Sequence, residues 1–176
     1  MANVKITGTG KIADSDYRYV KWVGKTKAGS AIQIVMPLAI CLSNPDWSFG
    51  EKTEAVPEIE FSGVYTDEKL LADDLTEPWE LTGPGATDGT KEIQLGAGRF
   101  YVGTKEADAK YVGLTRGGGS FVVERTYREI NADDDPGPVQ GRIHQDEGRP
   151  KLKLNALEWV DKIPTLYAGM NSAAAT

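Results

Sequence analysis

The residues best suited to chemistry are few. His144 is the only histidine and Cys41 the only cysteine of the 176 residues. A hydrolytic triad needs a nucleophile, a base and an orienting acid in one constellation, and no nucleophile motif surrounds His144. We therefore expect a structural or surface role for His144, and a buried, hydrophobe-like role for Cys41. A single cysteine also excludes a disulfide within the chain.

Acidic and glycine-rich motifs are equally incomplete. Asp133, Asp134 and Asp135 resemble part of a calcium loop, but the spacing and the closing glutamate of an EF-hand are missing, so an exposed turn is the better interpretation. The run at residues 8–11 lacks the full phosphate-loop spacing. Glu58 and Glu60 alternate along an expected strand, which is typical of a solvated face. The sequence thus predicts no enzyme, no metal site and no cofactor.

Composition favours one soluble, β-rich domain. Hydrophobic residues make up 40% of the chain and charged residues 26%, and 20 Gly with 9 Pro imply many turns. A net charge of −6 argues against a general nucleic-acid binder. The sequence shows no leader peptide and no apolar run of membrane-spanning length, so we expect a cytoplasmic protein without a membrane partner.

A long β-hairpin is expected between residues 117 and 157. Its first strand follows three glycines, starts apolar on both faces and becomes charged toward Ile130. Residues 131–138 supply a turn rich in Asn, Asp, Pro and Gly, and the chain returns to a half-buried strand at residues 151–157. Such a hairpin should begin in a core and project beyond it. That shape suits assembly better than catalysis.

The other elements follow from alternation and turn residues. Pro37 should end the third strand or place it at a sheet edge. The one clear helix signal spans residues 158–167, and residues 171–176 read as an unstructured tail. The expected further strands are residues 4–8, 17–25, 30–36, 52–64, 92–95, 99–103 and 110–114.

Residues 66–82, the arm segment, have leucines at roughly helical spacing that acidic residues and Pro78 interrupt. Alone they predict a marginal helix; alternatively, they form an arm that becomes ordered only against a neighbour. The apolar contacts of such an arm would be Leu70, Leu71, Leu75, Trp79 and Leu81. Residues 83–90 contain no large side chain and read as a flexible linker.

Two stretches resemble the halves of a long-tailed bacteriophage tail tube protein, also called a major tail protein. Residues 96–159 are similar to its N-terminal half, through a glycine-rich start, the motif at 112–118, the charged strand to Ile130 and a leucine-alternating strand leading into a helix. Residues 4–69 are similar to its C-terminal half, through a two-strand hairpin, an apolar run and an acidic–apolar final strand.

The halves stand in the opposite order from that family. Within a single domain, residues 1–82 resemble the C-terminal half, residues 83–90 form the linker, residues 91–170 resemble the N-terminal half, and residues 171–176 are the tail. We therefore hypothesise a circular permutant, natural or engineered, because permutation is tolerated where surface ends lie close together.

The resemblance implies a mainly β fold: a β-sandwich or partial barrel of two sheets with one flanking short helix and a projecting hairpin. It further implies hexameric rings that stack into a tube in the virion tail, assembled in the host cytoplasm. The implied partners are further copies of the chain, other tail proteins, and DNA that passes an electronegative lumen without specific binding. The implied inner-sheet strand is Glu124, Arg125, Thr126, Tyr127, Arg128 and Glu129, and the implied ring contacts are Asn131, Asp133, Asp134, Asp135, Pro136, Leu70, Leu71, Leu75 and Trp79.

Two other classes stay open. A tube component of a secretion or injection system would share the ring geometry and differ in what passes through it. A monomeric β-sandwich that binds carbohydrate or peptide would also be glycine-rich and acidic, and would expose Trp22, Trp47, Trp79 or tyrosines as a platform.

Overall fold

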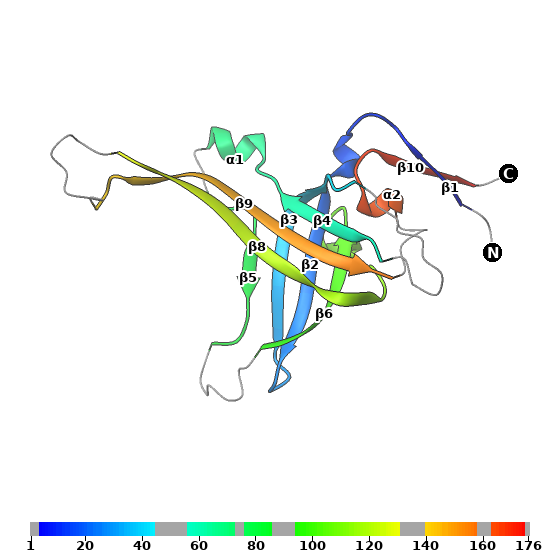
Figure 1. Ribbon diagram of the computed structural model, residues 1–176, viewed down its shortest axis with the longest axis horizontal. Coiled ribbons are helices and arrows are strands. Elements are labelled where there is room, and N and C mark those ends of the chain that lie inside the picture. The colour runs from blue at the N-terminus through cyan, green and yellow to red at the C-terminus, as the bar shows by residue number, and fades with distance from the viewer. Residues whose placement is uncertain are drawn as a thin grey trace.

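The computed structural model describes residues 4–44, 56–72, 76–85, 94–130, 140–157 and 163–174. As the sequence predicts, the fold is mainly β, with a large sheet of eight antiparallel strands, a separate two-stranded ribbon and little helix (Figure 1). The strand order in the large sheet is β7-β6-β2-β3-β4-β9-β8, and β5 pairs with β3 beside β4.

The large sheet comprises β2 (Arg18–Thr26), β3 (Ala31–Cys41), β4 (Glu58–Gly63), β5 (Glu80–Thr82), β6 (Gln94–Gly103), β7 (Lys110–Tyr111), β8 (Thr115–Glu129) and β9 (Ile143–Ala156). The ribbon pairs β1 (Val4–Gly8) with β10 (Met170–Ala174). The helices are α1 (Asp67–Leu71) and α2 (Ile163–Leu166), and short 3-10 turns cover Asp14–Asp16 and Glu106–Asp108.

The core lies against one face of the large sheet. Alternate side chains of β2, β3, β4 and β9 point into it, as half-buried strands require. Leu166 and Tyr167, at the end of α2, are buried in the same cluster. The buried members from the strands include Val20, Trp22, Ile34, Met36, Ile59, Phe61, Phe100, Leu152 and Leu154.

The large sheet curls so that β6 and β8, distant in strand order, approach each other on the core side. Phe100 of β6 lies beside Gly119 of β8. A pocket of about 360 Å³ between them is lined by residues of six strands, including Trp22, Phe121 and Leu152. This curvature gives the partial barrel that the sequence predicts.

Strand β3 continues through Pro37 to Cys41, contrary to the expectation that the proline ends it. Opposite Pro37, the register with β2 shifts between Arg18 and Val20, which leaves an extra residue on β3. On its other side β3 pairs with β5 at residues 33–35 and with β4 at residues 39–41. Pro37 therefore lies at a bulge between two partner strands, where the missing N–H leaves no gap in a ladder.

The two strands expected at residues 92–95 and 99–103 are one strand, β6. A register shift against β2 inserts two residues of β6 between Leu95 and Gly98. Gly24 and Gly98 pair directly, and a Cβ on either would overlap the indole of Trp22. The glycines at the bulge therefore allow Trp22 to lie across the sheet, and they do not end the strand.

The prediction of an unstructured tail at residues 171–176 is also wrong for residues 171–174, which the structure describes. Residues 170–174 form β10, which pairs with β1 from Gly8↔Met170 to Val4↔Ala174. The amide of Thr9 donates to the carbonyl of Gly169 at 2.7 Å, which joins the ribbon to the end of α2. Small residues have little β preference of their own, so pairing with β1 imposes this strand. The permutation hypothesis requires β1 to lie near the end of α2, and the Thr9–Gly169 hydrogen bond places them together.

Candidate assembly surface

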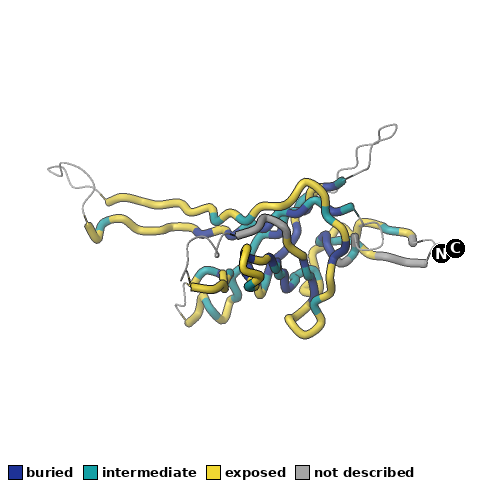
Figure 2. Tube along the Cα trace, turned by 90° about the horizontal axis from the view of Figure 1, so that it is seen from below, coloured by how far each residue is buried: buried dark blue, intermediate teal, exposed yellow. Residues whose placement is uncertain are grey.

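The hairpin predicted around residues 117–157 is present and projects from the body. We call the residues 124–130 of β8 and its end, and 142–149 around the start of β9, the projecting hairpin. Figure 2 shows its two strands leaving the body as an exposed ribbon. All six candidate inner-sheet residues, Glu124, Arg125, Thr126, Tyr127, Arg128 and Glu129, are exposed. The tip at residues 131–139, with the predicted contacts Asn131, Asp133, Asp134, Asp135 and Pro136, lies outside the described residues.

The hairpin register places charges of both signs on its faces. Glu124 pairs with Arg149, and Arg128 pairs with His144. A shift between Thr126 and Tyr127 leaves Asp146 as an extra residue, and its carboxylate lies 3.4 Å from the guanidinium of Arg128. His144, exposed in this strand, therefore has the surface position expected for it.

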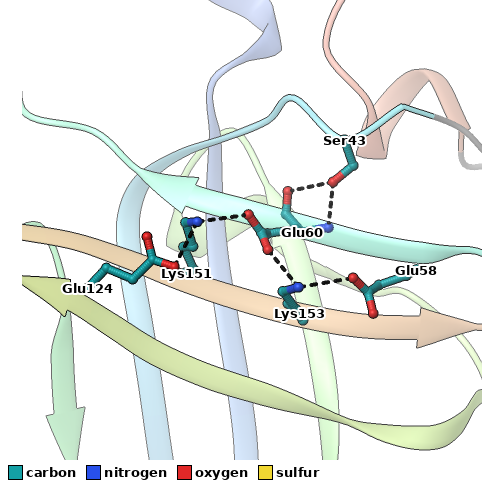
Figure 3. A network of polar contacts seen from close by, with 6 residues as sticks. All are labelled: Ser43, Glu58, Glu60, Glu124, Lys151 and Lys153. Carbon is teal, nitrogen blue, oxygen red and sulfur yellow. Dashed lines mark hydrogen bonds and ion pairs between the residues drawn. The ribbon is translucent and has the colours of Figure 1, made fainter.

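Nearer the body, the outer face of β4, β9 and β8 carries a ladder of ion pairs (Figure 3). The ammonium of Lys151 lies 2.9 Å from Glu124 and 3.6 Å from Glu60. The ammonium of Lys153 lies 3.0 Å from Glu60 and 3.1 Å from Glu58. Hydrogen bonding to these carboxylates raises the pKa of both lysines. The alternation of glutamates in the sequence thus marks a polar face whose charges are paired.

The opposite face of the hairpin base meets Glu77 of the arm segment. The guanidinium of Arg125 donates from Nε to Oε1 and from Nη2 to Oε2 of Glu77, both at 2.8 Å. Gln145 donates to Oε1 at 2.8 Å, and the indole of Trp79 donates to Oε2 at 2.6 Å. The hydrogen bonds from Arg125, above all, lower the pKa of Glu77 to about 2. Four donor groups on one carboxylate make it a fixed anion.

Helix α1 stands beside this cluster and carries Leu70 and Leu71, two of the residues predicted as arm contacts. The hydroxyl of Thr66 accepts from the amide of Lys69 and caps the helix. Leu70 and Leu71 are 54% and 89% exposed, as an interface role requires. A groove of about 880 Å³ separates α1 from the hairpin base. It is lined by Leu42, Val64, Tyr65, Leu70, Arg125 and Arg149, among others. Leu75 lies outside the described residues.

The end of the arm segment packs on its own chain, which contradicts, for residues 79–82, the alternative that the arm becomes ordered only against a neighbour. Residues 80–82 form β5 and pair with residues 33–35 of β3. Trp79 packs against Phe121 with ring centroids 5.2 Å apart. Burial of this indole and pairing of β5 are satisfied within one chain, so Trp79 is not a free interface residue. Leu81 remains 57% exposed.

Sequence reasoning missed Glu77, which joins the arm segment to the hairpin. Glu77 and Arg125 are 48 positions apart, and only the fold brings them together. Of the aromatic residues named for the alternative carbohydrate or peptide platform, Trp22 is buried and Trp79 half-buried, whereas Tyr111 and Tyr127 are exposed; Trp47 lies outside the described residues. Cys41 is buried, as predicted, and burial raises the pKa of its thiol.

Within the described ranges, no group of three or more His, Cys, Asp or Glu side chains is placed to hold a metal ion. The same part of the chain contains no helix with the length and apolar character needed to cross a bilayer.

No family model matches the chain, and neither a curated protein nor a solved structure matches it. The likeness to tail tube proteins therefore stays a prediction from the sequence.

Proposed function

We propose that this protein is a self-assembling structural protein whose copies form the stacked hexameric rings of a phage tail tube that conducts DNA. The observation that carries the proposal is the projecting hairpin, whose residues 124–129 and 143–147 are all exposed. A two-stranded ribbon is marginally stable in water unless something packs against it. A neighbouring copy would supply that packing.

The free edge of β8 supports the same proposal. This strand is the last in the order of the large sheet, and in the described part of the chain only β9 pairs with it. Strand β8 is fifteen residues long, and the outer edge of a strand presents backbone N–H and C=O groups that can pair with another chain. Where this edge pairs with a different surface of a neighbouring copy, the contact is head-to-tail, and contacts of that type close into rings when the rotation permits.

Passage of DNA requires a surface that does not retain a polyanion. Each lysine of the ladder lies between carboxylates, so this face offers no bare cationic stripe to phosphates. The net charge of −6 acts in the same direction. The proposed setting is the virion tail, assembled in the host cytoplasm, with other tail proteins as further partners.

Negative-stain microscopy with light scattering over a concentration series tests the proposal. We expect rings or tubes that appear above a threshold concentration. Replacement of residues 133–138 by a short turn should leave the circular dichroism spectrum unchanged and impair tube growth. A wild-type chain that stays monomeric at every concentration contradicts self-assembly, and unaltered tubes from the shortened variant contradict the role of the tip.

A further inference from the structure

The arm segment is attached firmly to the body just beyond Glu77. Pro78 is buried and lies near Gly63 of β4. Trp79 packs on Phe121, and the three residues of β5 pair with β3. Glu77 therefore projects from a segment whose next five residues are fixed to the sheet.

From this anchored position Glu77 reaches both strands of the hairpin. Arg125 belongs to β8 and Gln145 to β9, and each binds the same carboxylate at 2.8 Å. These contacts lie where burial ends: Gly148 and Pro150 are buried, whereas residues 143–147 are exposed. On the opposite face, Glu124 pairs with Lys151 of the ladder at 2.9 Å, and Glu77 adds the contact between the hairpin and the arm segment.

We propose that Glu77 is a positioning residue that fixes the direction in which the projecting hairpin leaves the body. Its consequence for assembly rests on the proposed function, because a hairpin that enters a neighbouring copy must arrive at a defined angle. Two-stranded ribbons twist and bend readily. A small rotation at Arg125 moves the far end of the hairpin by a much larger distance. A bidentate pair fixes orientation as well as distance.

Loss of Glu77 should change the orientation of the projecting hairpin without unfolding the body. The ion pair joins two peripheral segments, and 16% of the Glu77 side chain and 39% of the Arg125 side chain are exposed. Glu77 is not a member of the core cluster, and a glutamine in its place keeps the size of the side chain and one acceptor oxygen for the indole of Trp79. Loss of the carboxylate should therefore loosen the hairpin while the body stays folded.

The first test measures the monomer. Spin labels at Thr126→Cys on the hairpin and Lys27→Cys in the exposed turn after β2 report the distance between hairpin and body; Cys41 is buried and takes no label. We expect a narrow distance distribution for the wild-type background and one at least twice as broad for Glu77→Gln. Glu80→Gln, which removes an exposed carboxylate from the same segment, is the matched control and should remain narrow. A Glu77→Gln distribution as narrow as wild type overturns the proposal.

Arg125→Lys and the double variant Glu77→Gln/Arg125→Gln show whether the two residues act through each other. Lysine keeps the charge but lacks the planar fork, so it should broaden the distribution partly. The double variant should be no broader than Glu77→Gln alone; additive broadening contradicts the pairwise mechanism. If Glu77→Gln fails to fold, Arg125→Lys carries the same test, since it changes one exposed side chain.

The second test measures assembly. Glu77→Gln should raise the threshold concentration for rings or tubes at least tenfold, and Glu80→Gln should not change it. A broader hairpin distribution with an unchanged threshold overturns the assembly consequence. If the wild type does not assemble, the proposed function fails, and the distance measurement still decides the role of Glu77.

Discussion

Gly119 of β8 lies directly against Phe100 of β6, although these strands are near opposite ends of the large sheet. A Cβ on Gly119 would lie 3.2 Å from Cζ of Phe100 and would overlap the carbonyl oxygen of Lys153. The close approach brings the base of the hairpin onto the core side of the curled sheet. The partial barrel therefore depends on the absence of a side chain at one position.

Gly119→Ala should lower the free energy of unfolding by roughly 1–3 kcal/mol, because an added methyl in a packed contact forces neighbours to shift. Urea denaturation followed by tryptophan fluorescence measures this loss. Gly8→Ala is the control, since a Cβ on this strand glycine meets nothing within 4 Å. Equal stability of the two variants would contradict the proposed closeness of β6 and β8.

Acid should release the hairpin base through Glu77. The folded-state pKa of Glu77 is about 2, against an ordinary value of 4.5, because Arg125 and the other donors favour the carboxylate. Because the pKa of Glu77 is depressed, the stabilisation that its carboxylate gives to the hairpin base is complete above pH 4.5. This stabilisation decreases as the pH falls toward 2. The spin-label distribution of the wild type should broaden in that window. Glu77→Gln should show no such step; an identical acid response in both proteins would assign the change to other groups.

Tyr167→Phe should raise the free energy of unfolding by roughly 1 kcal/mol. The buried hydroxyl has no hydrogen-bond partner within the described part of the chain, and an unpaired buried donor is costly. Burial raises the pKa of Tyr167 to about 12, so stability should fall as the pH rises from 10 to 12, and the variant should lose this dependence. Tyr111→Phe, at an exposed position, is the control. A destabilised Tyr167→Phe would mean that its hydroxyl does have a partner.

The ion-pair ladder gives a test of DNA passage. Glu58→Gln/Glu60→Gln/Glu124→Gln removes the carboxylates around Lys151 and Lys153 and should produce salt-dependent binding to duplex DNA, measured by fluorescence anisotropy at several salt concentrations. The wild type should not bind. A control with the same net charge, Glu68→Gln/Glu80→Gln/Glu129→Gln, should bind at least tenfold more weakly. Equal binding by the two variants would show that net charge, and not the ladder, prevents DNA binding.

The parts of the fold that the sequence predicts depend on local pattern. Alternation places Ile59 and Phe61 in the core, and the change from apolar to charged residues along β8 predicts where the hairpin leaves the body. Local rules fail where a partner strand decides. Pro37 is tolerated because of a bulge and a change of partner, and the small residues 170–174 form a strand because β1 lies beside them.

The residues of the candidate assembly surface likewise include some that the sequence predicts and one that only the fold reveals. The leucine spacing predicts Leu70 and Leu71 as arm contacts, and both are exposed. The charged sequence predicts which residues of β8 belong to the projecting hairpin. Glu77 could not be found, because an acidic residue beside Pro78 looks like any loop glutamate. Its role depends on Arg125 and Gln145, which only the folded sheet brings within reach.

The β1–β10 ribbon has a mechanical consequence. Val4 and Ala174 are paired at its outer end, and Gly8 and Met170 at its inner end. A force that pulls residues 4 and 174 apart acts across the strands, so it loads one pair of hydrogen bonds at a time. The ribbon should unzip at low force, pair by pair, before any tension reaches the large sheet. Tethers attached at residues 4 and 174 would thus open the ribbon stepwise at low force before the core bears any load.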